Sequence, residues 1–286
     1  AADLGHSSEY NHQFWRDFRN AVKEANPKAI VLAEHYGDPS SWLAGDQWDT
    51  VMNYDAFMEP VTWFLTGMEK HSDESNPNLY GDGESFFRSM NYHMSRMMTN
   101  SMMVAMNELS NHDHSRFLTR TNRTVGRIST KGAKAASEGV NYGVFREAVL
   151  IQMTWPGAPT IYYGDEAGQQ GYEDPFNRRT YPWGSEDEAL LTFYRSLCAV
   201  RAGNPALANG SLEFLEAHGG VLLYLREDAD ERVLVAVNRT NETLNYEIAG
   251  TEQLESLLDG AVYEGSEGST VIELAPESAA LYRFGN

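Results

Sequence analysis

The chain opens with an alternation of helical and strand-like patterns. Residues 11–26 place apolar side chains at the spacing of one helix face, and Pro27 ends the pattern. Residues 29–33 then form a short, uninterrupted apolar run, which is typical of a strand buried on both faces. The polar residues 34–38 follow at once. The pattern therefore predicts a helix, a buried strand and a polar cluster at the end of the strand.

The same unit recurs further along the chain. The other predicted segments are strands at 50–54 and 160–163, helices near 56–68, 85–100, 138–153 and 186–201, and an apolar segment at 101–109 that ends in polar residues. Residues 155–159 contain Pro and Gly and predict a turn. Polar residues at the ends of short buried strands are where a β/α barrel carries its chemistry. About four βα units are present, so we expect an α/β fold, the C-terminal half of a (β/α)8 TIM barrel.

The pattern changes after about Leu207. From there on, apolar and polar positions alternate in short segments that are separated by Gly, Asn and Asp. No long helical pattern remains. We therefore divide the chain into residues 1–204, the C-terminal half of a catalytic barrel, and residues 205–286, a small antiparallel β-sandwich domain.

Composition and charge narrow the classes of partner. The formal net charge of −19 argues against nucleic acid, whose phosphates require a basic surface, and against anionic membranes. No apolar run reaches the roughly 18 residues of a membrane-spanning helix, so we expect no membrane insertion. A neutral carbohydrate is compatible with this charge, and the aromatic share of 12% suits stacking on sugar rings. The single cysteine, Cys198, excludes an intrachain disulfide, and we expect it to be buried.

Two acids close apolar segments and are the candidate catalytic residues. Glu34 follows residues 29–33, and Asp113 follows residues 101–109. Either acid alone could be structural, capping the next helix or pairing with an arginine such as Arg116. Two acids at the ends of two strands on the same barrel face instead indicate that both acids line one cleft. Glycoside cleavage needs this pair, because one carboxyl protonates the leaving oxygen while negative charge stabilises the oxocarbenium-like transition state.

Two histidines, His35 and His112, flank these acids. Histidine and carboxylate side chains together can bind zinc, but the sequence shows neither a His-Glu-x-x-His helix nor a third ligand. We therefore expect no metal and no cofactor in this chain. His112 is better explained as a donor of a hydrogen bond to a substrate hydroxyl.

Several segments resemble the α-amylase superfamily, glycoside hydrolase family 13. LAEHYGD resembles the segment that holds the general acid of that family, and LSNHDHSRF is similar to its Asn-His-Asp segment. PGAPTIYYGDEAG resembles the eighth barrel strand, and EDPFNRRTYPW resembles the loop after it. DQWDTVMNYDAF adds to the match. The resemblance covers nearly the whole chain and is closest to the neopullulanase, cyclomaltodextrinase and amylopullulanase branch.

The resemblance implies a role for each matching residue. Glu34 would be the general acid and base of a retaining enzyme that cleaves starch-type α-glucans, and Asp113 the carboxylate that stabilises the transition state. Six further residues would bind substrate: His35, Tyr36, Asn111, His112, Asp174 and Arg178. Tyr36 would stack at the leaving-group side, where relatives often carry Trp. Asp174 and Arg178 would bind a more distant glucose, unless they form an ordinary ion pair.

One part of the family's machinery is missing. The family's nucleophilic aspartate precedes two alanines, and the chain opens Ala1-Ala2-Asp3. By this resemblance the nucleophile is expected just before Ala1, and Asp3 falls too late. We expect the N-terminal half of the same enzyme, on the same or a separate chain, to supply it together with any calcium-binding loop. The chain alone is predicted to be inactive. The alternative is a non-catalytic relative that only binds carbohydrate.

Overall fold

Four short parallel strands form the framework of the first part of the chain. The computed structural model describes residues 8–285. The four strands are β1 (Leu32–Ala33), β2 (Thr50–Val51), β3 (Met106–Glu108) and β4 (Ala158–Thr160). β1 pairs with β2 and β3 with β4, and a parallel bridge between Met52 and Met106 joins the two pairs. The predicted order of βα units is confirmed.

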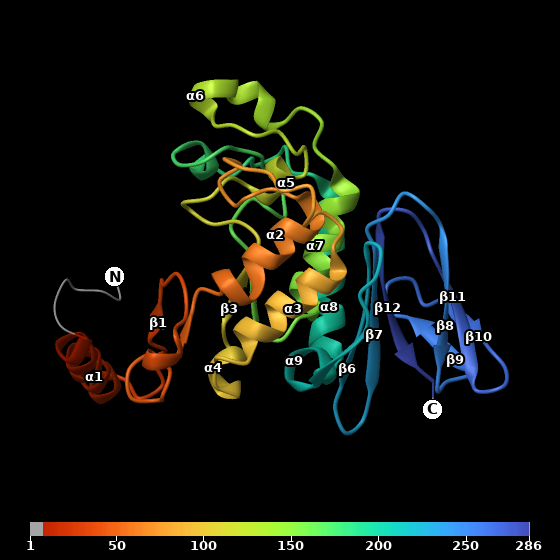
Figure 1. Ribbon diagram of the computed structural model, residues 1–286, viewed down its shortest axis with the longest axis horizontal. Coiled ribbons are helices and arrows are strands. Elements are labelled where there is room, and N and C mark those ends of the chain that lie inside the picture. The colour runs from red at the N-terminus through yellow and green to blue at the C-terminus, as the bar shows by residue number, and fades with distance from the viewer. Residues whose placement is uncertain (1–7, 286) are drawn as a thin grey trace.

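Helices of different lengths precede, separate and follow these strands (Figure 1). The α-helices are α1 (Ser8–Ala25), α2 (Glu59–Thr66), α3 (Gly83–Met94), α4 (Thr99–Met102), α5 (Phe117–Arg120), α6 (Ile128–Lys131), α7 (Tyr142–Thr154), α8 (Glu188–Gly203) and α9 (Pro205–Asn209). A π-helical turn, η2 (Tyr54–Met58), precedes α2, and the 3-10 turns are η1 (Ser40–Trp42), η3 (Ala133–Ala136) and η4 (Phe176–Arg178). None of the described helices is long and apolar enough to cross a membrane.

The structure corrects two strand predictions and one burial prediction. β1 is not buried on both faces, because Ile30 and Leu32 are 65% and 41% exposed, while Val31 and Ala33 pack inward. The last strand lies at Ala158–Thr160, in the segment predicted as a turn, because its register is fixed by pairing with β3 rather than by its own composition. Cys198 is exposed, since it lies on the outer face of α8.

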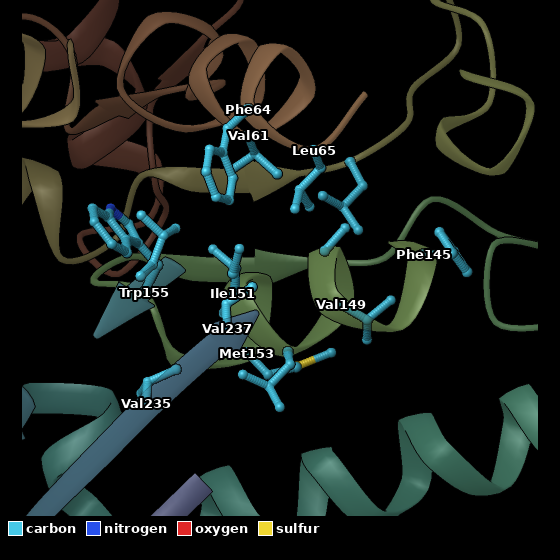
Figure 2. Close-up of a cluster of buried hydrophobic side chains, with 14 of the residues drawn as sticks. Val61, Phe64, Leu65, Phe145, Val149, Ile151, Met153, Trp155, Val235 and Val237 are labelled. Atoms are coloured by element: carbon cyan, nitrogen blue, oxygen red, sulfur yellow. The ribbon is translucent and has the colours of Figure 1, made fainter. Parts of the chain in front are cut away.

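Helix α7 is the centre of the main hydrophobic core. Figure 2 shows Val61, Phe64 and Leu65 of α2 on one side of α7, and Val235 and Val237 of a strand on the other. Residues 142–154 are apolar around most of the helix, and nearly all of them are buried. An all-round apolar helix must be covered on several sides. The core therefore joins the barrel elements to the C-terminal domain.

The C-terminal domain is a two-layer antiparallel β structure. One sheet has the order β10-β9-β12-β7-β6-β5, and a second pairs β11 with β8. The strands are β5 (Ser211–Glu216), β6 (Val221–Glu227), β7 (Arg232–Asn238), β8 (Leu244–Ala249), β9 (Gln253–Ser256), β10 (Val262–Glu264), β11 (Ser269–Leu274) and β12 (Ser278–Phe284). Alternate residues of β6 face opposite sides, Leu222 and Tyr224 toward the helices and Leu223 and Leu225 toward the second sheet. The predicted sandwich is confirmed.

Amide side chains fix the ends of the barrel strands relative to one another. Asn53 Nδ2 donates to Asn107 Oδ1 at 2.7 Å, and Asn107 Nδ2 donates to the carbonyl of Pro156 at 3.0 Å. Gly157 leaves room for this link, because a Cβ there would lie 2.5 Å from Asn107 Nδ2. Buried polar groups that are paired in this way specify one arrangement of the strands.

Candidate active site

Three predicted residues meet at the carboxyl ends of β1 and β3. Glu34 directly follows β1, and His112 and Asp113 lie in the loop after β3. His112 Nε2 is 3.5 Å from Asp113 Oδ1 and 3.9 Å from Glu34 Oε1, and all three groups lie within 4.8 Å of one another. Their side chains are 42%, 43% and 41% exposed for Glu34, His112 and Asp113. The arrangement presents two carboxyls and an imidazole to solvent at one point.

Arg178 and Asp174 extend this cluster. Arg178 pairs with Asp174 at 3.0 Å and reaches Asp113 Oδ1 at 3.5 Å. Its Nε also donates to the carbonyl of His112 at 2.9 Å. The ion pair that was left open by the sequence is therefore present, and it lies beside Asp113. The guanidinium of Arg178 therefore lies against two carboxyl groups, those of Asp174 and Asp113.

Buried amides hold the loop that carries His112 and Asp113. Asn111 Oδ1 accepts from the backbone N–H groups of Asp113 and His114, both at 3.0 Å. Asn177 Nδ2 lies 3.1, 2.8 and 2.7 Å from the carbonyls of Asn111, His112 and His114. Both amides are buried. Asn111, predicted to bind substrate, instead belongs to the framework of the loop, and Asn177 was missed although it lies within the quoted segment EDPFNRRTYPW.

Tyr54 and Glu108 take part in the hydrogen bonds between the loop after β3 and Glu34. Asn111 Nδ2 donates to Glu108 Oε1 at 2.7 Å and to Tyr54 Oη at 3.1 Å, and Tyr54 Oη donates to Glu34 Oε1 at 3.2 Å. Burial, followed by repulsion from Glu34, raises the pKa of Glu108 to about 8, although the bond from Asn111 opposes the shift. Sequence reasoning missed both residues, since an acid inside an apolar strand gives no sign of its partners.

Tyr36 and His35, adjacent in sequence, point to different places. Tyr36 lies flat on Tyr54, with centroids 4.4 Å apart and planes inclined by 10°. One face of the predicted stacking residue is thus already covered. His35 packs against Trp42 and Trp48 at 4.9 and 5.5 Å, and burial lowers its pKa. The structure does not bring His35 into the cluster of Glu34, His112 and Asp113.

Arg116, named as an example of an arginine that could pair with the acids, pairs with neither of them, and the arginine near Asp113 is Arg178. Arg116 is fully buried and pairs with Asp165 at 2.9 Å. Its other donors reach the carbonyls of Asn177 and Tyr163, at 3.0 and 2.7 Å, and the side chain of Gln169. Glu34 and Asp113 are therefore free of this arginine.

The structure also supplies the third ligand that the sequence lacked for a metal site. Glu34, His112 and Asp113 each offer one ligand atom within 4.8 Å of the others. The guanidinium of Arg178 lies 3.5 Å from the same Asp113 oxygen that His112 approaches. This positive charge opposes a cation at that oxygen. Acid and base chemistry on a neutral substrate does not meet this obstacle.

Each of the two parts of the chain matches a known protein family. The model of the alpha amylase catalytic domain matches residues 5–196, and the model of the maltogenic amylase C-terminal domain matches residues 212–281. These matches agree with the barrel elements and with the β-sandwich, respectively.

Individual relatives give the same result. An amylopullulanase from Thermoanaerobacterium saccharolyticum is 33% identical over 270 residues, which is 90% of this chain and 20% of the relative. Neopullulanase 2 from Thermoactinomyces vulgaris is 33% identical over 280 residues, 94% of this chain and 43% of the relative. A solved cyclomaltodextrinase structure matches with a TM-score of 0.80 and 28% identity, covering 96% of this chain and 43% of that chain. The chain thus spans less than half the length of these relatives.

Proposed function

This chain belongs to the α-amylase family of glycoside hydrolases, and from that premise we propose that it forms the C-terminal half of the catalytic barrel of a retaining α-glucan glycosidase. Its substrates would be starch-type glucans with α-1,4 and, in some, α-1,6 bonds. The observation that carries the proposal is the convergence of Glu34, His112 and Asp113 at the carboxyl ends of the barrel strands.

The proposed roles follow from the surroundings of each acid. Asp113 lies beside His112 and Arg178, both able to carry positive charge, so it suits the permanently ionised role of transition-state stabiliser. Glu34 has no arginine or lysine partner among the ion pairs of the described residues and lies in one cluster with Asp113 and His112. A carboxyl with no permanent cation beside it suits the general acid, which has to lose and regain a proton during the catalytic cycle. His112 would donate to the sugar between the two carboxyls.

A retaining mechanism also requires a nucleophilic carboxylate, which we propose comes from the N-terminal half of the same enzyme, on the same or a separate chain. Within residues 8–285, β1 and β4 each pair along one edge only. Ile30 and Leu32 at the β1 edge are exposed. Open apolar edges of this kind invite pairing with further strands. Closing the barrel there would bring a third carboxylate toward Glu34 and Asp113.

The direct test is hydrolysis of a linear α-glucan by this chain alone and by the chain joined to the N-terminal barrel half. We expect turnover with retained anomeric configuration, followed by NMR, only when both halves are present. Glu34→Gln in the complete protein should lower kcat by at least about a hundredfold. Glu247→Gln, an exposed acid on β8, is the matched control and should leave kcat unchanged.

Leaving-group chemistry separates the two carboxyl roles. An α-glycosyl fluoride needs no proton on its leaving group, so Glu34→Gln should form the glycosyl-enzyme from it far faster than from a glucan. Asp113→Asn should be slow with both substrates, because transition-state stabilisation is needed in either case. A complete protein that binds glucan without turnover would instead be a non-catalytic carbohydrate-binding relative, and the enzymatic proposal would then be abandoned.

A further inference from the structure

We propose that Tyr54 is a positioning residue for Glu34, anchored by Asn111 and Glu108, and that it selects which oxygen of Glu34 carries the catalytic proton. The inference rests on the proposed function, since it concerns how the general acid is held. None of these three residues touches the surface where substrate would bind, because all three are buried.

The path from β3 to Glu34 is a continuous series of hydrogen bonds. Asn111 Nδ2 carries two hydrogens, and its two partners are Glu108 Oε1 at 2.7 Å and Tyr54 Oη at 3.1 Å. Tyr54 Oη accepts that bond and has one hydrogen of its own, for which the acceptors are Glu34 Oε1 at 3.2 Å and Met52 Sδ at 3.5 Å. The carboxyl oxygen is the stronger acceptor, because a thioether sulfur accepts only weakly. The bond from Asn111 and the stronger acceptor at Glu34 together direct the Tyr54 hydrogen toward Glu34.

The anchor is rigid because every polar atom of Asn111 is engaged. Its Oδ1 accepts from two backbone N–H groups and its Nδ2 donates twice, so the amide cannot flip without losing four bonds. The ring of Tyr54 is covered by Tyr36 on one face. A side chain fixed at both its ring and its hydroxyl places the hydrogen-bond donor at one position.

This geometry assigns different tasks to the two oxygens of Glu34. Oε1 accepts from Tyr54, so a proton on the carboxyl is directed to Oε2, the oxygen left for the glycosidic bond. In the first step Oε2–H transfers its proton to the leaving oxygen, and Glu34 becomes a carboxylate. In the second step the same oxygen takes a proton from the attacking water. Tyr54 stays protonated throughout, because burial raises its pKa above the usual range.

The groups around Glu34 determine how removal of the Tyr54 hydroxyl should change the pH dependence of activity. Glu34 is faced by His112 and Asp113 from the loop after β3, by Glu108 of β3, and by Tyr54 of η2, while Arg178 of η4 lies beside Asp113. The bond from Tyr54 is strongest to the ionised carboxylate. Removing it therefore withdraws stabilisation from the Glu34 carboxylate while leaving the other groups in place.

The test is Tyr54→Phe in the complete protein. We expect kcat/KM for glucan to fall about tenfold to a hundredfold, the loss of one hydrogen bond to a charged group. The basic limb of the pH profile, which reports the general acid, should move up by about one pH unit. Formation of the glycosyl-enzyme from an α-glycosyl fluoride should be nearly unchanged. Tyr224→Phe, which removes a buried hydroxyl bonded to Thr154 at 2.6 Å, is the matched control and should shift neither.

Substitutions of Glu108 test the anchor. Glu108→Gln retains an oxygen that can accept from Asn111, so it should keep the basic limb in place. Glu108→Leu removes the acceptor and should reproduce part of the Tyr54→Phe shift. An equal loss of activity in both Glu108 variants would show that Glu108 acts only in folding and would overturn its part of the proposal.

Measuring the titration of Glu34 directly distinguishes failure of this inference from failure of the proposed function. The Glu34 carboxyl can be titrated by carbon-13 NMR in this chain, and Tyr54→Phe should raise its midpoint whether or not the chain is active. An unchanged midpoint and an unmoved basic limb would overturn the inference. Full glucan hydrolysis by Glu34→Gln would instead contradict the proposed function, and the NMR midpoint would still decide whether Tyr54 holds Glu34.

Discussion

Tyr36 Oη and His114 Nε2 lie 3.0 Å apart, although the two residues are 78 positions apart in the chain. His114 is fully buried, and burial followed by the charge of Arg120 lowers its pKa to about 2. The imidazole is therefore neutral in the folded protein and accepts from the phenol or donates to it without charge. This bond ties the segment after β1 to the loop after β3.

Because His114 is buried and neutral, the free energy of unfolding should depend on pH. The unfolded chain binds a proton at His114 below its ordinary pKa near 6.5, while the folded chain does not until about pH 2. Stability should therefore fall as the pH drops below about 6.5, at up to about 1.4 kcal/mol per pH unit for this group. Urea unfolding of the wild type and His114→Gln between pH 4.5 and 7.5 measures it. Equal slopes for the two proteins would contradict the prediction.

Glu108 should act in the opposite direction. Its pKa of about 8 in the folded chain lies above the ordinary value of 4.5, so the folded state holds a proton that the unfolded state has lost. Its contribution is complete below about pH 4.5 and is lost as the pH rises toward 8, at up to about 1.4 kcal/mol per pH unit. Glu108→Gln should flatten the fall in unfolding free energy across pH 5–8. A slope as steep as that of the wild type would show that Glu108 is not protonated at neutral pH.

The buried ion pair between Arg116 and Asp165 should be sensitive to truncation. Arg116→Ala leaves Asp165 buried without its charge partner and frees several acceptors, so we expect a loss of about 3–5 kcal/mol in unfolding free energy. The exposed pair of Arg127 and Asp73 is the control, and Arg127→Ala should cost no more than about 1 kcal/mol. Thermal or chemical unfolding of both variants decides between these values.

Gly157 is expected to tolerate no side chain. Its φ is +132°, and a Cβ would lie 2.5 Å from Asn107 Nδ2, which bonds to the carbonyl of Pro156. Gly157→Ala should therefore cost about 1–3 kcal/mol for the clash in addition to backbone strain. Gly184→Ala is the control, because Gly184 has φ +76° with nothing within 4 Å. If the two variants are equally destabilised, strain alone explains the requirement and the contact with Asn107 does not.

The sequence predicted an element correctly where its hydrophobic periodicity was clear and a helix-breaking or turn residue marked its end. The helix expected at residues 11–26 is α1, and the helix expected at 138–153 is α7 with a later start. The pattern failed at β4, because a three-residue strand that contains Pro159 carries no strand signal of its own and exists through pairing with β3. It also failed for the outward face of β1, whose exposure depends on which strands lie beside it.

The pattern of residues along the chain was enough to place Glu34 and Asp113 after barrel strands and a β-sandwich behind them, because strand ends and turn residues are local properties. Which side chains meet these two acids depends on how distant segments pack together. Tyr54, Asn111 and Glu108 join Glu34 through hydrogen bonds between segments that lie far apart along the chain. The protonated state of Glu108 and the neutral state of His114 arise from burial, which depends on the packing of several elements at once.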